Sequence, residues 1–213
     1  DFGDVSVAMR NFLRKQEKKR FSPGTWAAIT YLNLKDPATM KLMRFGMMDF
    51  GFKAQRLANK AAKALGLVQE TRAHPPVSLG APTVKTQIIH FLNRPMPGNL
   101  PKRTSRALLD IEDDKVIPVI RNPRKTTEES DAVFYFPRCG SERLFSQVGL
   151  ATQAMLYEVG ATTVLPPGYL CCGYPQTASG DDDKGQKITT DNRVLFHRVA
   201  NTLNYLDIKT VIV

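Results

Sequence analysis

Hydrophobic residues in the first third of the chain recur at the spacing of amphipathic helices. Two of the three stretches with this pattern begin at a polar residue and a proline, Ser22-Pro23 and Asp36-Pro37. Such a pair is typical of a helix start, because the polar side chain caps the first turn and proline fits the first helical position. Gly66 is a natural stop for the last helix. The predicted helices cover residues 5–21, 25–34 and 38–65, and two glycines can divide the third.

The middle of the chain is rich in proline and has little periodicity. Residues 67–106 contain six prolines, a residue that breaks helices and removes a hydrogen-bond donor from sheets. We predict a connecting segment over residues 67–115. Its one apolar run, residues 88–92, can dock on a neighbouring domain.

Beyond residue 116, short apolar runs alternate with helical patterns. The first run is apolar almost throughout, as expected for a strand covered on both faces. The alternation predicts an α/β fold with parallel strands joined by right-handed crossovers. The predicted strands cover residues 132–136, 162–165 and 208–213; the predicted helices cover residues 144–160 and 190–206, the second following a solvated turn at Asp181, Asp182 and Asp183.

These patterns divide the chain into a basic helical segment (1–66), the connecting segment (67–115) and an α/β half-domain with a parallel sheet (116–213). The chain begins without methionine, and its last four residues have the pattern of a buried strand with nothing after it. We therefore expect the sequence to be a piece of a longer protein. An interrupted sheet also leaves an edge strand that can pair with a second copy of the chain.

The charge of the chain is unevenly distributed. Residues 1–106 carry 19 Lys or Arg against six Asp or Glu, whereas residues 107–213 carry 11 against 14. A basic half can bind nucleic acid or an anionic membrane, or it can dock on an acidic neighbouring domain. No nucleic-acid motif accompanies the charge, so we favour a solvated or docking face and expect no nucleic-acid partner. No apolar run approaches the ~18 residues that cross a bilayer, which predicts no transmembrane segment.

The chain has three cysteines, of which two are adjacent. Secreted disulfide frameworks normally use even numbers and many more cysteines per residue. The count therefore favours a reducing compartment, the cytoplasm. Each cysteine taken singly could also be a small buried hydrophobic residue.

The positions of the cysteines favour a ligand role. Cys139 directly follows a predicted strand and precedes a helix, and Cys171 and Cys172 lie in the loop after the next strand. Loops at the carboxyl ends of parallel strands converge, and helix N-termini there stabilise thiolates. Gly140 and Gly173 remove side-chain bulk beside the thiols, so backbone amides can approach a cofactor. We predict metal ligation by the three cysteines, with the two glycines lining the cofactor, although iron–sulfur clusters usually have four thiolate ligands.

Three stretches carry a family resemblance: residues 136–147 (FPRCGSERLFSQ), 166–175 (PPGYLCCGYP) and 192–206 (NRVLFHRVANTLNYL). The spacing from Cys139 to the Cys-Cys-Gly triplet resembles the first part of the cysteine-rich CCG domain. That domain occurs in heterodisulfide reductases and in the iron–sulfur subunits of glycolate and lactate oxidation systems. The three stretches most resemble those of large bacterial fusion proteins in which an FAD-binding oxidase module and a ferredoxin-like module precede this region.

The resemblance implies an iron–sulfur electron-transfer segment of an FAD-linked 2-hydroxyacid oxidoreductase of the glycolate or lactate type. Its implied cofactor is a 4Fe-4S cluster on Cys139, Cys171 and Cys172, with FAD only in the parent protein. The implied partners are the flavin and ferredoxin-like modules of that parent. The implied location is the cytoplasm, or the inner face of the membrane as a peripheral protein. We do not expect the isolated chain to be catalytic.

The chain departs from the family pattern at two places. The pattern closes with Cys-x-x-Cys, and the 41 residues after Cys172 contain no cysteine. Arg138 stands where the family tends to have glycine before the first cysteine. The ligand set in this chain is therefore incomplete. Two alternatives stay open: a structural or interaction fragment that docks on a larger chain without metal, and a zinc-binding scaffold, because thiolates also suit Zn²⁺.

Overall fold

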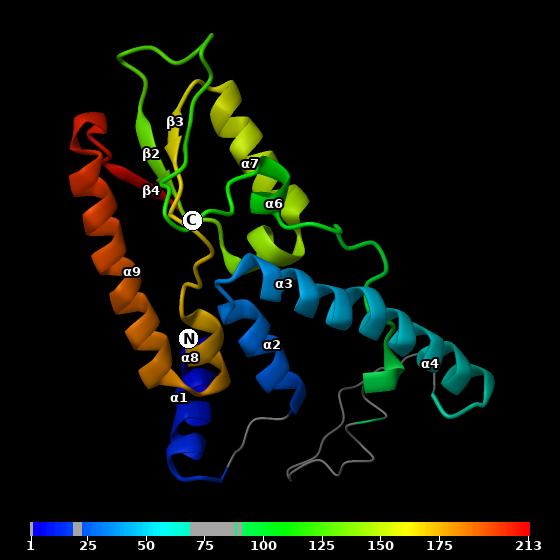
Figure 1. Cartoon of the computed structure of the whole chain (residues 1–213). Coiled ribbons are helices and arrows are strands. Elements are labelled where there is room, and N and C mark those ends of the chain that lie inside the picture. The colour runs from blue at the N-terminus through cyan, green and yellow to red at the C-terminus, as the bar shows by residue number, and fades with distance from the viewer. Residues whose placement is uncertain (1, 19–22, 69–87, 89–90) are drawn as a thin grey trace. The chain divides into compact units, whose positions relative to one another are not determined.

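The computed structural model describes residues 2–18, 23–68, 88 and 91–213 (Figure 1). The chain forms two compact units, one made of Asp1–Met40 with Pro101–Val213 and the other of Lys41–Leu100. The sequence pattern divided the chain into three consecutive segments. In the structure, the first unit instead combines residues from both ends of the chain. The predicted cap Ser22 and residues 89 and 90 of the predicted 88–92 run lie outside the described residues.

The first unit is built on a four-stranded sheet in the order β1-β3-β2-β4. β2 pairs in parallel with both β3 and β4, while β1 pairs antiparallel with β3. The α/β class and the three expected strands are thereby confirmed; β1 was not expected. The strands are β1 (Val119–Ile120), β2 (Ala132–Tyr135), β3 (Thr162–Val164) and β4 (Thr210–Ile212).

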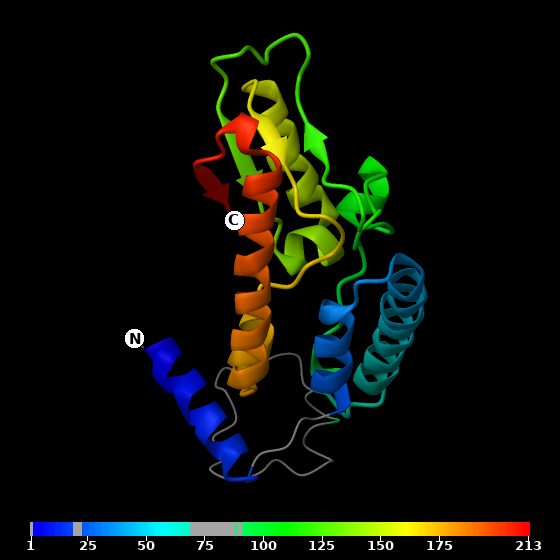
Figure 2. The same ribbon diagram turned by 60° about the vertical axis from the view of Figure 1, so that its left-hand side comes forward.

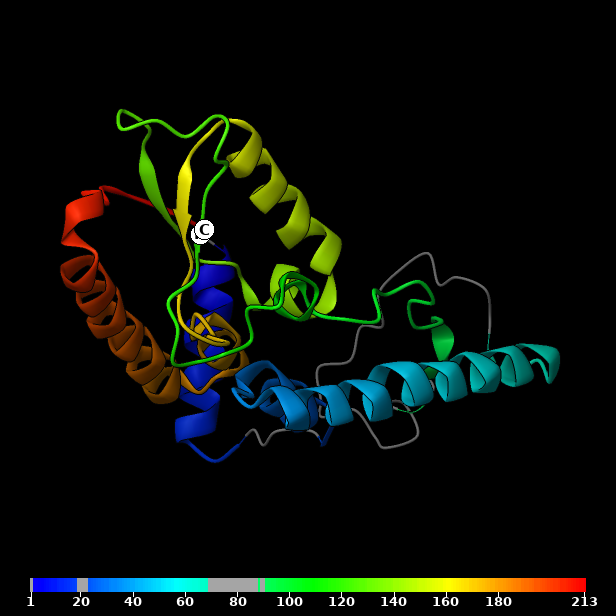
Figure 3. The ribbon, with the colours of Figure 1, turned by 45° about the horizontal axis from the view of Figure 1, so that its top comes forward.

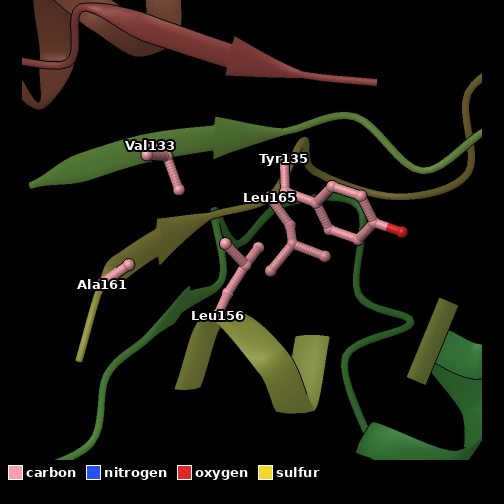
Figure 4. Close-up of a cluster of buried hydrophobic side chains, with 5 residues drawn as sticks. All are labelled: Val133, Tyr135, Leu156, Ala161 and Leu165. Carbon is pink, nitrogen blue, oxygen red and sulfur yellow. The ribbon is translucent and has the colours of Figure 1, made fainter. Parts of the chain in front are cut away.

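Two helices cover opposite faces of this sheet, α7 (Ser146–Glu158) and α9 (Asp182–Thr202) (Figures 1 and 3). Successive side chains of a strand point to opposite faces, so β2 contributes to two cores. Both faces of β2 are buried, which explains its nearly continuous apolar sequence. On the α7 side the core is Val133, Tyr135, Leu156, Ala161 and Leu165 (Figure 4); on the α9 side it is Phe134, Phe136, Val164 and Val199.

α7 ends in a glycine turn that leads directly into β3. Gly160 has a φ of +83°, its N–H donates to the carbonyl of Tyr157 (3.2 Å), and the N–H of Ala161 donates to that of Leu156 (3.1 Å). These paired bonds satisfy the last carbonyls of the helix. Ala161 and Leu156 also meet in the core, so the turn fixes how α7 returns to the sheet.

The helix α9 begins earlier than expected. Asp181 is its N-cap residue, and Asp182 and Asp183 form its first turn. The expectation of a solvated turn here was wrong, because acidic side chains are favourable beside the positive end of the helix dipole. A short helix, α8 (Tyr174–Ser179), precedes α9 and packs against it (Figure 2). The loop expected after Cys172 is therefore mostly helical.

Three further helices belong to this unit: α1 (Phe2–Lys15), α2 (Pro23–Asn33) and α6 (Ser105–Leu109). α1 and α2 both contact α8. The Asn11 side chain on α1 accepts a bond from the N–H of Asp182 (3.0 Å), and Arg10 donates to the carbonyl of Ala178 (2.9 Å). α6 lies in the stretch expected to be irregular, and Thr104 caps it by accepting from the N–H of Ala107 (3.2 Å).

The expected third helix is continuous but changes its winding midway. It consists of α3 (Pro37–Arg44), a π-helical segment η1 (Phe45–Gly51) and α4 (Phe52–Ala64). Asp36 caps its start, because its carboxylate accepts from the N–H of Thr39 (2.7 Å). Hydrogen bonds with the Thr39 side chain and then with its N–H lower the pKa of the carboxyl. Gly46 and Gly51, the two glycines expected to divide the helix, both lie in the π-helical segment and do not interrupt the helix.

The unit Lys41–Leu100 is held together by polar side chains of α4. Gln55 donates to the carbonyls of Phe91 (2.7 Å) and Arg94 (2.8 Å), and its oxygen accepts from the N–H of Met96 (2.9 Å). Gln55 is 4% exposed. These bonds satisfy backbone groups of residues 91–96.

None of the helices in the described part of the chain has the length and apolar character needed to cross a membrane.

Candidate functional site

The first cysteine lies in a tight turn between β2 and α7. Cys139 is half-buried and stands at the N-terminal boundary of a π-helical turn, η2 (Gly140–Leu144). The carbonyl of Arg138 accepts bonds from the N–H of Glu142 (2.9 Å) and the hydroxyl of Ser141 (3.0 Å). Single π-helical turns occur frequently at functional sites. The helix predicted from the sequence covers residues 144–160, and the pattern gave no sign of this turn before it.

The second loop runs from the end of β3 into α8 and carries the other two cysteines. Cys171 is buried and Cys172 is half-buried. Gly173 follows with a φ of +87°, and a Cβ on it would lie 2.5 Å from the carbonyl oxygen of Gly185. A side chain is therefore excluded at this position, which brings the start of α8 against α9.

Gly140 and Gly173 have different structural roles. A Cβ on Gly140 would have no neighbouring atom within 4 Å, and its φ is not positive. Gly173 is required by its backbone conformation and by close packing. The role of both glycines beside a cofactor stays a prediction.

The thiols of Cys139, Cys171 and Cys172 meet at the carboxyl ends of β2 and β3. Hydrogen bonds with Cys171 and Cys172 raise the pKa of the Cys139 thiol. The pKa of Cys172 is lowered chiefly by hydrogen bonds with Cys139 and Cys171, and further by backbone N–H groups that include that of Tyr174 at the start of α8. The opposite directions of these two shifts make Cys172 more acidic than Cys139.

A cavity of about 1060 Å³ opens beside these thiols. Cys139 and Cys172 both line it, and most of its remaining wall is apolar or aromatic. The polar groups on its wall include Arg138, Arg193 and Asn192. Both loops thus present a thiol to one space large enough for a cofactor of several atoms.

Side chains of α8 and α9 hold the second cysteine loop in place. Asn192 donates to the carbonyl of Cys171 (2.8 Å), and Thr189 donates to that of Cys172 (3.3 Å). The Cys171 thiol donates to the side-chain oxygen of Gln176 (3.7 Å), whose side chain is fully buried and donates to Asn33 on α2. Asn192, Thr189 and Gln176 were not predicted from the sequence, because nothing in their spacing marks them as partners of the cysteines.

Three charged side chains are buried behind the cysteines. Arg106, Glu142 and Arg143 are each exposed by 1% or less, and Arg106 forms an ion pair with Glu142. Burial raises the pKa of Glu142, and the two guanidiniums oppose that rise. Burial likewise lowers the pKa of Arg143, opposed by Glu142 and by the thiols of Cys171 and Cys139. Arg143 also contacts the second cysteine loop, because its Nη2 donates to the carbonyl of Leu170, the residue before Cys171 (3.4 Å).

Among the residues that the structure describes, no group of three or more His, Cys, Asp or Glu side chains is arranged so that it could hold a metal ion. The three thiols are soft donors that converge, yet they supply three ligands where a cluster usually takes four. The donor atoms are therefore of the kind that binds an iron–sulfur cluster, but the chain supplies one fewer than the usual four.

The fold and the cysteine group define the chain as an α/β protein with three thiols gathered at the carboxyl ends of parallel strands. Comparisons with protein-family models, with curated proteins and with solved structures found no match.

Proposed function

We propose that the chain is an iron–sulfur electron-transfer segment in which Cys139, Cys171 and Cys172 are the protein ligands of the cluster. The observation that supports the proposal is that these three thiols come together although 31 residues separate Cys139 from Cys171 in the sequence. Three buried or half-buried thiols rarely meet by packing alone, because free cysteines pack as separate small hydrophobic residues.

The surroundings of the thiols suit an anionic cofactor. Backbone N–H groups at the start of α8 and the guanidinium of Arg143 lie near the sulfur atoms. Hydrogen bonds and charges around cluster sulfurs set the reduction potential of such cofactors. A cluster is also larger than a single ion, so its ligands need not point at one centre. The cavity lined by Cys139 and Cys172 gives room for it.

When bound, a cluster supplies one-electron transfer. The protein would contribute the three thiolates, the hydrogen bonds that hold both loops, and apolar walls that limit solvent access. The assignment to an FAD-linked 2-hydroxyacid oxidoreductase rests on the resemblance of residues 136–147, 166–175 and 192–206 alone. In that setting the flavin and ferredoxin-like modules of the parent protein would be its electron-transfer partners.

Anaerobic reconstitution with ferrous iron and sulfide tests the proposal. We expect visible charge-transfer absorption and bound iron and sulfide, and we expect a small external thiol, offered as a fourth ligand, to raise the yield. Replacing any one of Cys139, Cys171 or Cys172 by serine should abolish most of the absorption. Ser141→Ala is the matched control, because Ser141 lines the same cavity without a thiol.

Two other results would identify the alternatives. Retention of one equivalent of zinc, lost in the serine variants, would assign a zinc scaffold. A folded chain that binds neither metal, with or without the external thiol, would favour a structural or interaction fragment.

A further inference from the structure

The cysteine loops are joined by a buried guanidinium that the proposed ligand set does not include. Arg143 is 0% exposed and lies on η2, four residues after Cys139. A buried charge is costly unless hydrogen bonds and an opposite charge compensate it. The partners of Arg143 therefore indicate why it is buried at this point.

Arg143 binds the second cysteine loop directly. Its Nη2 donates to the carbonyl of Leu170 (3.4 Å), the residue before Cys171, and its guanidinium carbon lies 5.5 Å from the ring centroid of Tyr169. Its Nη1 donates to the carbonyl of Tyr31 on α2 (2.9 Å), whose hydroxyl donates back to the carbonyl of Arg143 (3.3 Å). One planar side chain thus connects three segments of the chain.

Glu142, the residue before Arg143, is also connected to the second cysteine loop, through the guanidinium of Arg106. Glu142 pairs with Arg106, and Nη2 of Arg106 donates to the carbonyl of Pro166 (2.8 Å). Arg106 also lies over the Tyr169 ring, with its guanidinium carbon 5.7 Å from the centroid. Residues 142 and 143 therefore hold the loop from 166 to 170 at both ends.

We infer that Arg143 is a positioning residue that fixes the Cys139 loop against the Cys171-Cys172 loop, so that the thiols of the two loops face one another. Its fork of N–H groups serves Leu170 and Tyr31 together, which the single ammonium of lysine cannot do in the same geometry. The two guanidiniums and the Glu142 carboxylate also leave one net positive charge beside the thiols, which favours an anionic cofactor there. The importance of this positioning rests on the proposed function, but its test does not need a cluster.

The distance between the loops can be measured in the metal-free protein with dibromobimane, which becomes fluorescent when it links two thiols. In a Cys171→Ser background the two remaining cysteines are Cys139 and Cys172, which both line the cavity, and we expect them to cross-link. Adding Arg143→Lys should slow cross-linking about fivefold, as expected when about one hydrogen bond between the loops is lost. Arg124→Lys is the matched control, because it changes an exposed arginine that does not line the cavity and should leave the rate unchanged.

A second variant guards against loss of folding in Arg143→Lys. Tyr31→Phe removes the hydroxyl that donates to the carbonyl of Arg143 and should slow cross-linking by a smaller factor. Circular dichroism establishes that each variant is folded before the rates are compared. Cross-linking at the wild-type rate in folded Arg143→Lys, or in Tyr31→Phe if the former does not fold, would overturn the inference. Absence of iron binding in a chain whose cross-linking does depend on Arg143 would instead overturn the proposed function alone.

Discussion

At the scale of single residues, the cysteine group depends on side chains whose sequence context gives no sign of their role. The three cysteines could be chosen from the sequence because each follows a predicted strand. Arg143 could not, because a charged residue near the start of a helix normally faces solvent. Its burial depends on Tyr31, which is 112 residues away in the chain and closes over it from α2.

The two glycines beside the cysteines provide a matched pair of substitutions. Gly173→Ala would place a Cβ against the carbonyl of Gly185 in a backbone conformation that alanine rarely adopts, so we expect a loss of about 1–3 kcal/mol in the free energy of unfolding. Gly140→Ala meets open space in a helical turn and should change it by less than about 0.5 kcal/mol. Urea denaturation measures both. Equal effects would contradict the packing role of Gly173.

The thiols should differ in how their reactivity depends on pH. The thiolate is the nucleophile, and the pKa of Cys172 is lowered while that of Cys139 is raised. Near pH 6 an ordinary thiol is protonated, so the lowered pKa gives Cys172 a larger thiolate fraction than Cys139. We expect iodoacetamide to modify Cys172 at least about tenfold faster than Cys139 at this pH, and the Cys139 rate to be still rising above pH 9.

Fragmentation of the tryptic peptides by mass spectrometry separates Cys172 from Cys171 and gives the rate at each thiol. Reactivity at Cys139 that is already constant near neutral pH would contradict the assignment of protons within the group. Urea-unfolded chain is the control, because its three thiols should share one profile.

At the scale of elements, the sequence located the buried strands more accurately than the turns between them. β2 and β3 lie within a residue or two of the expected runs, because strands covered on both faces need apolar residues almost throughout. The start of α9 was missed because Ser-Gly-Asp-Asp-Asp is typical of a loop, yet the same aspartates stabilise a helix N-terminus. The π-helical segments η1 and η2 were missed because one extra residue in a turn leaves no mark in periodicity.

Gln55 gives a test of the second unit, Lys41–Leu100. Gln55→Ala removes three part-buried hydrogen bonds to residues 91–96, so we expect a local loss of about 1–3 kcal/mol. Hydrogen exchange at Met96 should accelerate, and exchange in the sheet of the other unit should not. Lys60→Ala, an exposed change on the same helix, is the control. Unchanged exchange at Met96 would show that Gln55 does not hold this segment.

At the scale of the whole molecule, the sheet has an edge strand that can pair with another chain. β4 pairs with β2 on one side and, among the described residues, with no strand on the other. Val211 on this strand is 50% exposed. Unpaired edges with exposed apolar residues are templates for strand addition, and lysine on the edge opposes it.

We therefore expect the chain to self-associate through β4. Val211→Lys should weaken the association about tenfold, since a charged edge disfavours pairing. Val194→Lys is the control, because this valine is exposed to a similar degree on α9 and away from the edge. Sedimentation equilibrium gives the association constants. An equal effect of both substitutions would exclude β4 as the contact.

The sequence alone determined the α/β class, the positions of the buried strands and the choice of three cysteines. Those features depend on local patterns, because strand burial and loop position follow from the residues next to each other in the chain. Only the tertiary structure decided that the three thiols meet, that Cys139 and Cys172 share one cavity, and that Arg143 and Asn192 hold the cysteine loops. These contacts join residues that are distant in sequence, and their geometry depends on how α2, α7 and α9 pack around the sheet.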